Sequence, residues 1–399
     1  MKLLPAALTL LVLATPLAAQ DSTSTSTPAT DVPWRTSYFP YFTVSPNDGL
    51  MGIGRVLFFR QANYDDRVSL RDAVALEGGY STRKAWLLRG RVDLPRLRDG
   101  WRLAASVEGG RQPHFGVPEA PISRSRAGGW VDVTRRLKGP LQLALRGAVA
   151  HQRIEGDYSL YFRYPRTTID ADGCPPPMLC FAVTGQHVSQ TDINGRAALV
   201  LDLRDREFDT RKGALIEAGL FTGSGGGDQG YFGGYAIARG WVSPRRGTRL
   251  TARIGMQRVS KTDGIGILHE IPAWESPITT FGGPNSHRGL GIGAVPGRGG
   301  DLASGEVRHD LLNVGEIGAI TAVVFVDGSR AYQDKLSPLV DPTPGVRYPV
   351  SGLNLTAQNW NVGVGGGVAI RVLRSAQLTI TAARGAGVTR WYVSSGWSW

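Results

Sequence analysis

The chain has 399 residues, of which 53 are glycine, 4 are methionine and 42% are hydrophobic, and this composition favours many short strands and turns over a helical bundle. Its formal charge of +12 comes from 45 lysines and arginines against 33 acidic residues. The arginines are dispersed through alternating segments and form no basic helix or tail, so we expect them to line a lumen or meet anionic lipid headgroups, and we expect no nucleic-acid partner.

Residues 1–20 predict a cleaved export signal peptide. Lys2 precedes a short core of leucine, alanine and valine, and small residues follow at Ala18 and Ala19. No cysteine directly follows this core, so we expect no lipid-anchored N-terminus. Residues 21–36 predict a Ser/Thr-rich linker. No later apolar run approaches the roughly 18 residues of a spanning helix, so the exported chain is either soluble or crosses a membrane as strands.

Several segments alternate in hydrophobicity with a period of two. In residues 84–93, apolar side chains such as Leu88 share one face, and mostly charged ones such as Arg89 share the other. Residues 141–149 and 193–204 repeat the pattern. A β-sandwich would also alternate, but it would be dense with large apolar groups inside. Here the polar face carries arginine, glycine and small residues, which favours a barrel with lipid outside and a wet interior.

The connections alternate between short and long, as in outer-membrane barrels, whose periplasmic turns are tight and whose external loops are extended. The candidate short turns are 94–100, 135–140, 243–248 and 373–377, and the candidate long loops are 111–125, 155–187, 261–300 and 329–358. Residues 37–399 are therefore predicted to form an all-β, transmembrane antiparallel β-barrel of about 16 strands, an even number that leaves both termini in the periplasm. Its first strand is expected near Ser37–Val44 and its last at Val388–Trp399.

The two cysteines predict a disulfide. Cys174 and Cys180 lie in the candidate external loop 155–187, in an oxidising compartment, and they close a small ring.

The chain ends in an aromatic strand. Trp397 and Trp399 share one face, and interfacial aromatic girdles explain such residues physically. The strand is also similar to the C-terminal sorting signal by which barrels are recruited for insertion.

The stretch FGGPNSHRGLG (281–291) places glycines and a proline around one arginine, Arg288. It resembles the loop-six motif of the BamA/TamA superfamily of outer-membrane assembly and translocation barrels, the bacterial surface antigen family, whose core is Arg-Gly-aromatic preceded by a Gly-Gly turn. Several motifs in register are more specific than one glycine-rich loop. The other segments that resemble this family are LDLRDREFDTRKG (201–213), with Asp202, Arg204, Asp205 and Gly213 in a periplasmic turn motif, SGEVRHDL (304–311), FVDGSRAY (325–332) and FPYFTVSPNDGLMGIG (39–54).

The resemblance implies that loop six folds inward into the lumen and that Arg288, in the motif with Gly289 and Leu290, meets Glu306 and Asp327. The alternation of the two strands agrees, because it sends both carboxylates to the interior, and a carboxylate facing lipid would be expensive. Neighbouring glycines let the loop pack against the wall, and a planar guanidinium bridges two carboxylates at once. The alternative is that Arg288 is one more arginine lining the lumen.

Two features depart from the family pattern. Leu290 stands where the family usually has an aromatic residue, which weakens the ring packing expected inside the barrel. Residues 21–36 are too few for one of the periplasmic POTRA domains that receive client proteins in this family, so the resemblance implies a stand-alone, short-form barrel.

Other chemistry is scarce in this sequence. Its 6 histidines are scattered without metal-ligand spacing, and no Ser-His-Asp motif, phosphate loop or carboxylate pair is present. The glycine-rich residues 222–234 join two predicted strands and open no helix, so we interpret them as a hairpin loop. We therefore predict no catalytic residue, no metal site, no cofactor and no enzymatic activity.

These predictions together describe a barrel of the bacterial outer membrane, in contact with outer-membrane lipids and lipopolysaccharide. The resemblance implies a role in inserting or translocating outer-membrane proteins, with unfolded barrel proteins as clients and a wall that opens laterally between the first and last strands. The alternative is a passive, anion-favouring pore or a structural surface barrel. The sequence predicts no oligomeric state.

Overall fold

The structure is a computed structural model that describes residues 32–61, 67–68, 70–115, 122–156, 187–225, 230–260, 270–275, 277–278, 281–294, 297–315, 318–334, 336–338, 347–349, 355–372 and 376–395. The predicted signal peptide, Cys174, Cys180, Trp397 and Trp399 lie outside the described residues and stay predictions. Within the described part of the chain, no helix is long and apolar enough to cross a bilayer.

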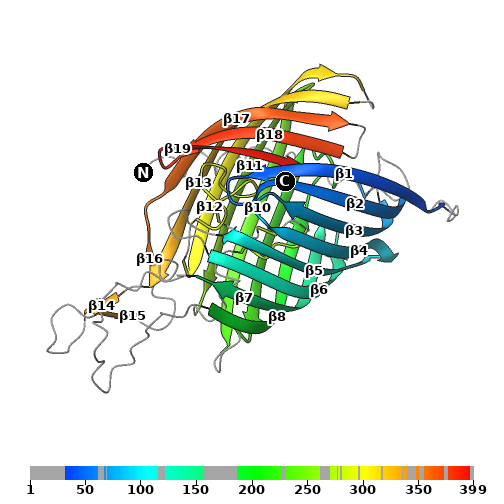
Figure 1. Cartoon of the computed structure of the whole chain (residues 1–399). Coiled ribbons are helices and arrows are strands. Elements are labelled where there is room, and N and C mark those ends of the chain that lie inside the picture. Colours follow the sequence, from blue (N-terminus) through cyan, green and yellow to red (C-terminus); the bar gives the residue numbers. More distant parts are fainter. Residues whose placement is uncertain are drawn as a thin grey trace.

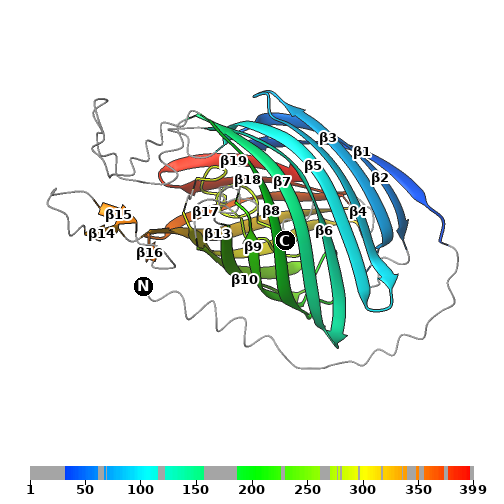
Figure 2. The ribbon, with the colours of Figure 1, turned by 90° about the horizontal axis from the view of Figure 1, so that it is seen from below.

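Sixteen antiparallel strands form a closed barrel, in which each strand pairs with its neighbours along the chain and β1 also pairs with β19 (Figure 1). The wall runs from the blue N-terminal strands through the green ones back to the red C-terminal ones, as Figures 1 and 2 show from two directions. These strands confirm the predicted all-β barrel and its strand number. The barrel strands are β1 (Arg35–Ser45), β2 (Gly49–Gln61), β3 (Leu70–Ser81), β4 (Trp86–Arg98), β5 (Trp101–Phe115), β6 (Ile122–Lys138), β7 (Leu141–Glu155), β8 (His187–Asp202), β9 (Gly213–Gly223), β10 (Tyr231–Arg245), β11 (Thr248–Val259), β12 (Gly299–Asn313), β13 (Gly318–Asp334), β17 (Asn361–Val372), β18 (Ala376–Gly385) and β19 (Val388–Ser395).

Three short strands lie between β13 and β17. β14 (Leu336–Pro338) pairs with β15 (Arg347–Pro349) in a separate two-stranded sheet. β16 (Leu355–Ala357) pairs with the end of β13, beyond the part of β13 that pairs with β17.

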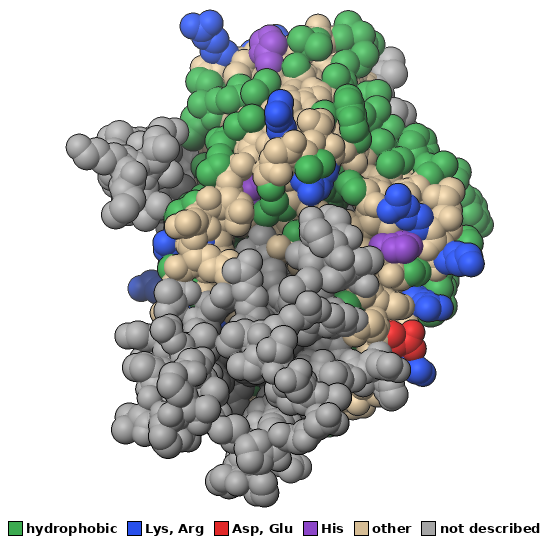
Figure 3. Space-filling view, turned by 60° about the vertical axis from the view of Figure 1, so that its left-hand side comes forward, with side chains coloured by type: hydrophobic (Ala, Val, Ile, Leu, Met, Phe, Trp, Pro, Cys, Tyr) green, Lys and Arg blue, Asp and Glu red, His purple; other side chains and the backbone are tan. Residues whose placement is uncertain are grey.

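The outer face of the barrel is apolar. Leu88, Val107 and Leu220 are 64%, 67% and 72% exposed, and each alternates along its strand with residues of the inner face. Hydrophobic side chains cover much of the coloured wall in Figure 3. Because a soluble protein rarely exposes a continuous apolar surface, this face is suited to lipid.

The two ends of the barrel differ in their connections. The predicted short turns are confirmed at β4–β5, β6–β7 and β10–β11, and we call this end the turn end. Residues 373–375 of the predicted turn between β17 and β18 lie outside the described residues. The opposite, loop end holds the connection between β11 and β12. The predicted loop 111–125 is wrong in part, because β5 continues to Phe115 and β6 starts at Ile122, and both of these side chains are buried. The connections β1–β2, β3–β4 and β18–β19 are also short at the loop end, which the sequence analysis did not identify.

Candidate functional site

Arg288 lies in the connection between β11 and β12, between two carboxylates. Its Nε and Nη2 donate to Asp327 Oδ2 and Oδ1 at 2.8 and 2.9 Å, and its backbone N–H donates to Oδ2 at 3.0 Å. Its Nη1 donates to Glu306 Oε2 at 2.5 Å. The side chains of Arg288, Glu306 and Asp327 are 6%, 1% and 0% exposed. The structure thus brings together the three residues grouped by the sequence analysis, with the two-pronged contact that strengthens an arginine–carboxylate pair.

Two residues missed by the sequence analysis complete this group. The Arg288 Cζ lies 3.3 Å from the centroid of the Phe325 ring, so the guanidinium stacks on an aromatic face. The Arg308 Nε donates to Glu306 Oε1. Their positions were readable from period-two spacing, because Phe325 is two residues before Asp327 and Arg308 is two residues after Glu306. We call these five residues the Arg288 cluster.

Gly289 and Leu290 join this connection to the last two strands. A Cβ on Gly289 would lie 3.1 Å from the Cα of Gly385, so glycine permits the close approach of two backbones. The Gly289 carbonyl accepts a hydrogen bond from Arg390 Nη1 at 2.6 Å, and the Leu290 carbonyl accepts one from the Tyr392 hydroxyl at 2.7 Å. The motif residues therefore bind β19 through their backbone.

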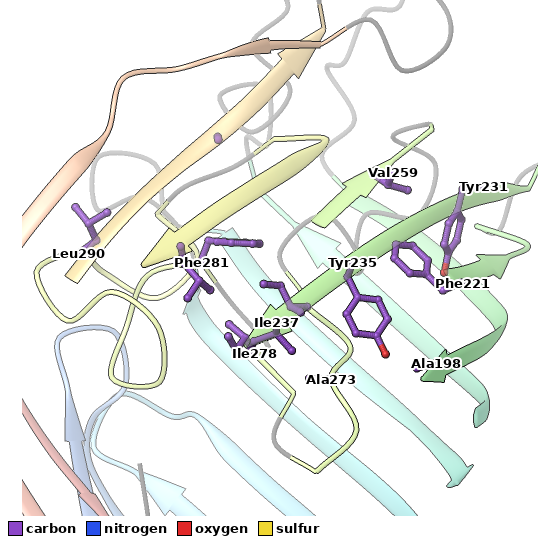
Figure 4. Close-up of a cluster of buried hydrophobic side chains, with 13 residues drawn as sticks. Ala198, Phe221, Tyr231, Tyr235, Ile237, Val259, Ala273, Ile278, Phe281 and Leu290 are labelled. Atoms are coloured by element: carbon purple, nitrogen blue, oxygen red, sulfur yellow. The ribbon is translucent and has the colours of Figure 1, made fainter. Parts of the chain in front are cut away.

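An apolar cluster holds the chain on either side of Arg288 against the barrel wall. Ile278 and Phe281 are 2% and 1% exposed, and they lie in one cluster with Ile237 of β10 (Figure 4). Leu290, which stands at the expected aromatic position, is 6% exposed and belongs to the same cluster. Full burial of a side chain of this size contributes roughly 1.5–3 kcal/mol, so apolar packing adds substantially to the ionic contacts.

Residues 270–292 bond to strands far round the ring. The carboxylate of Glu270 accepts from Arg126 Nη1 at 2.8 Å, and the Trp274 N–H donates to the Glu217 carboxylate at 2.8 Å. The strand residues that bond this segment include Arg102 on β5, Arg126 on β6, Arg146 on β7, Arg196 on β8, Glu217 on β9, Arg253 on β11, Glu306 on β12, Asp327 on β13, Asn361 on β17 and Tyr392 on β19. Burial lowers the pKa of His287 in this segment, so its ring is neutral at pH 7.

The β8–β9 turn carries the other predicted motif residues. Asp202 Oδ1 accepts from the backbone N–H and the Nε of Arg204 at 3.1 and 2.9 Å. Asp205 accepts backbone N–H groups of the same turn. Gly213 has φ of +111°, and a Cβ there would meet a backbone carbonyl oxygen at 2.2 Å. These contacts fix the turn, and Arg204 Nη1 reaches from it to Glu275 at 2.7 Å.

A second guanidinium lies between two carboxylates at the turn end. Arg102 Nη1 is 2.8 Å from Glu207 in the β8–β9 turn and 3.4 Å from Glu275 in the β11–β12 connection. Burial raises the pKa of Glu207 to about 7, although the charge of Arg102 opposes this effect. Burial also opposes ionisation of Glu275, but Arg204 and Arg102 hold the pKa of this carboxyl below its usual range. This contact was not predicted from the sequence, because the three elements that form it are far apart in the chain.

The ring closes at one short contact, which we call the seam. Among the described residues, β1 and β19 are paired at a single position, Val44 with Val393, whereas β1 pairs with β2 along its whole length. Among the described strands, no other neighbouring pair in the ring is so short. The Asn47 side-chain oxygen, in the β1–β2 turn, accepts the backbone N–H of Ile292 at 3.1 Å. Since Tyr392 binds the Leu290 carbonyl from β19, the β11–β12 connection is bonded to both sides of the seam.

Metal-ligating residues are dispersed in the described part of the chain. No group of three or more His, Cys, Asp or Glu side chains is placed there to hold a metal ion. The predictions of no cofactor and no enzymatic activity stay predictions.

Comparison with known proteins gives a fold match and no sequence match. The sequence matches no protein-family model and no curated protein. The structure is similar to BamA from Haemophilus ducreyi lacking POTRA domains 1–3, with a TM-score of 0.56 and 12% identity over 90% of this chain and 70% of that one. It is also similar to CdiB from Escherichia coli, with a TM-score of 0.54 and 12% identity over 91% of this chain and 67% of that one. At this identity the likeness concerns the fold, and it confirms the resemblance to BamA-type barrels at that level.

Proposed function

We propose that this chain is an outer-membrane barrel that helps outer-membrane proteins insert or cross by opening at the seam. The supporting observation is the single paired position between the described residues of β1 and β19. Opening the seam unpairs fewer backbone groups than opening any full ladder, and each unpaired group in lipid costs several kcal/mol. An extended client segment restores those hydrogen bonds when it adds to a freed strand edge.

We also propose that residues 270–294 form a loop six that lies in the lumen and latches the seam. The contacts that support this proposal join residues 270–292 to strands that face one another across the ring. A single segment of this length reaches all of these strands from inside the barrel. The Arg288 cluster anchors the latch on β12 and β13. From this anchor, Leu290 and Ile292 bind the two sides of the seam.

The apolar outer face supports a position in the outer membrane, in contact with outer-membrane lipids and lipopolysaccharide. By the rule that tight turns are periplasmic, the turn end faces the periplasm. The clients on this proposal are unfolded outer-membrane proteins, which approach the barrel from that side.

A disulfide across the seam tests the proposal. Val44→Cys with Val393→Cys, in a chain whose native cysteines are replaced by serine, joins the one paired position of the seam. Leu143→Cys with Leu199→Cys is the matched control, because it joins one paired position of the long β7–β8 ladder. In liposomes we expect the oxidised seam variant to lose its acceleration of the folding of a second barrel and to regain it on reduction. Full activity of the oxidised seam variant would contradict lateral opening.

One observation favours a passive anion pore as the second candidate. Arg55, Arg89 and Arg91 alternate with lipid-facing residues on β2 and β4, so they face the lumen, and their side chains are 41%, 49% and 38% exposed. Each of these arginines also pairs with Glu77 or Asp93, so only the part of their charge that these acids leave uncompensated favours anions. Large, steady, anion-selective currents in a bilayer, with no effect on client folding, would support this function over the assembly role.

A further inference from the structure

A cavity opens on the inner face of the barrel at the turn end, and Arg308 is the one member of the Arg288 cluster that lines it. Its volume is about 200 Å³. It is lined by the β8–β9 turn, the β10–β11 hairpin and the adjoining ends of β12, β13, β17 and β18. Arg288, Glu306 and Asp327, whose contacts anchor the proposed latch, do not line this cavity.

The cavity is strongly cationic. Two aspartates, Asp209 and Asp310, are the acidic residues of its lining. Asp310 accepts hydrogen bonds from the neutral side chains of Asn313 and Thr321 at 3.0 and 2.8 Å. Asp209 is shared by three arginines of the lining. The arginines that line the cavity are Arg211, Arg245, Arg246, Arg249, Arg308 and Arg371.

Two of these arginines are placed directly opposite each other. Arg249 on β11 and Arg308 on β12 are cross-strand partners on the inner face. Like charges at such positions destabilise a sheet unless a counter-charge lies between them. Arg308 is partly compensated by Glu306, but Arg249 has only its share of Asp209 among the described residues.

A third arginine has an unused donor. The Nε of Arg371 on β17 is buried and has no hydrogen-bond partner among the described residues. Its Nη1 lies 3.8 Å from Asp209, and its Nη2 donates to the Gly315 carbonyl at 3.2 Å. A buried donor left unpaired costs roughly 1–3 kcal/mol. At the rim, Arg245 and Arg246 are exposed and make no ion pair with a described acidic residue.

We propose that this cavity is a binding site for a phosphate group carried by a soluble periplasmic molecule. The lining holds an excess of several positive charges, which a dianion neutralises better than a single carboxylate does. Guanidinium groups bind phosphate with two parallel N–H donors, and those of this site come from a turn, a hairpin and two strands, which suits a tetrahedral anion. The cavity faces the lumen, so the headgroup of a bilayer lipid, whose acyl chains lie outside the wall, does not reach it.

Calorimetric titration with inorganic phosphate at constant ionic strength tests the site in the full-length, detergent-solubilised barrel. We expect one phosphate to bind per chain. Titrations repeated at a higher, again constant, ionic strength are expected to give a lower affinity. The variant Arg249→Gln with Arg371→Gln is expected to lose at least tenfold in affinity. The control Arg89→Gln with Arg91→Gln removes two luminal arginines of β4 and is expected to bind phosphate as the parent does. Absence of binding, or equal loss in both double variants, would overturn the proposal.

A second variant keeps the test decisive if the double variant folds poorly. Ala319 lines the cavity and is the cross-strand partner of Arg371, so Ala319→Asp supplies an internal anion. We expect this variant to unfold at a higher temperature than the parent and to bind no phosphate. Retained phosphate binding in Ala319→Asp refutes the assignment. A tetraglutamate peptide that binds more tightly than inorganic phosphate, or dihexanoyl-phosphatidylglycerol that binds more tightly than glycerol phosphate, refutes the soluble phosphate ligand.

Discussion

Replacement of Arg288 by alanine removes the centre of the Arg288 cluster and tests the latch directly. The change deletes three charge-assisted side-chain hydrogen bonds, two to Asp327 and one to Glu306. It also removes the guanidinium from the Phe325 ring. The backbone N–H of residue 288 still donates to Asp327, so the loop keeps one contact at this position.

The free-energy cost of Arg288→Ala depends on which cationic partner each carboxylate keeps. Removing one partner of a buried ion pair costs about 3–5 kcal/mol, because the other charge stays buried and unpaired. Glu306 keeps Arg308, so Asp327 carries most of the loss, and we expect the lower end, about 3 kcal/mol. Since 1.4 kcal/mol is a factor of ten, the population of the released loop rises by roughly a hundredfold.

Limited proteolysis of the folded barrel measures this population, provided that the loop opens and closes faster than it is cut. We expect the rate of cleavage between β11 and β12 to rise by roughly a hundredfold in Arg288→Ala and less in Arg288→Lys, whose ammonium lacks the planar fork. The matched control is Arg258→Ala, because Arg258 also pairs with an aspartate, at 2.7 Å, and stacks on a tyrosine ring, but it lies on the outer face. Asp327→Asn is expected to give a milder increase, and combined with Arg288→Ala it is expected to cost less than the sum. Strict additivity, or an unchanged cleavage rate in Arg288→Ala, would show that Arg288 only lines the lumen.

Three further predictions concern the turn end and the external loop. Gly213→Ala is expected to lower the midpoint of urea unfolding, because its Cβ has no room and its φ is positive, whereas Gly147→Ala, with open space around it, is expected to change the midpoint little. Burial raises the pKa of Glu207 from 4.5 to about 7, so the folded β8–β9 turn favours the protonated acid. We therefore expect the protection of this turn from hydrogen exchange to be greatest below pH 4.5 and to fall towards pH 7. A flat pH profile of protection in the parent, or the parent's profile unchanged in Glu207→Gln, would refute this. On intact cells, Cys174 and Cys180 are expected to react with an impermeant thiol reagent only after reduction, and labelling without reduction would contradict the disulfide.

The fold was predictable because its signal is local. Alternating residues such as Leu88 and Arg89 report which face of a strand meets lipid, and each strand carries this information by itself. Strand ends were less predictable, since the residues near Phe115 and Ile122 read as a loop, yet they pair and are buried once their neighbours are in place.

The candidate site was predictable in part, for a related reason. Arg288, Glu306 and Asp327 were grouped from motifs and strand faces, and the structure places them in contact. The contact of Arg102 with Glu207 and Glu275 depends on how a turn and a loop fold back over distant strands, which no periodicity encodes. The short pairing at the seam is likewise not encoded by periodicity, although the resemblance implied that the wall opens between the first and last strands.

The distribution of contacts argues that the loop, more than the wall, sets the cost of opening the seam. Among the described residues the wall contributes one paired position there, so few backbone hydrogen bonds break when the seam opens. The connection from β11 to β12 adds hydrogen bonds to Asn47 on one side and Tyr392 on the other, and it is itself held by the Arg288 cluster. A change that frees this anchor therefore weakens both sides of the seam together, although none of the residues changed lies on β1 or β19. On the proposed function, Arg288 controls lateral opening from a distance. A variant whose loop is released but whose seam stays closed would show that loop release does not open the seam.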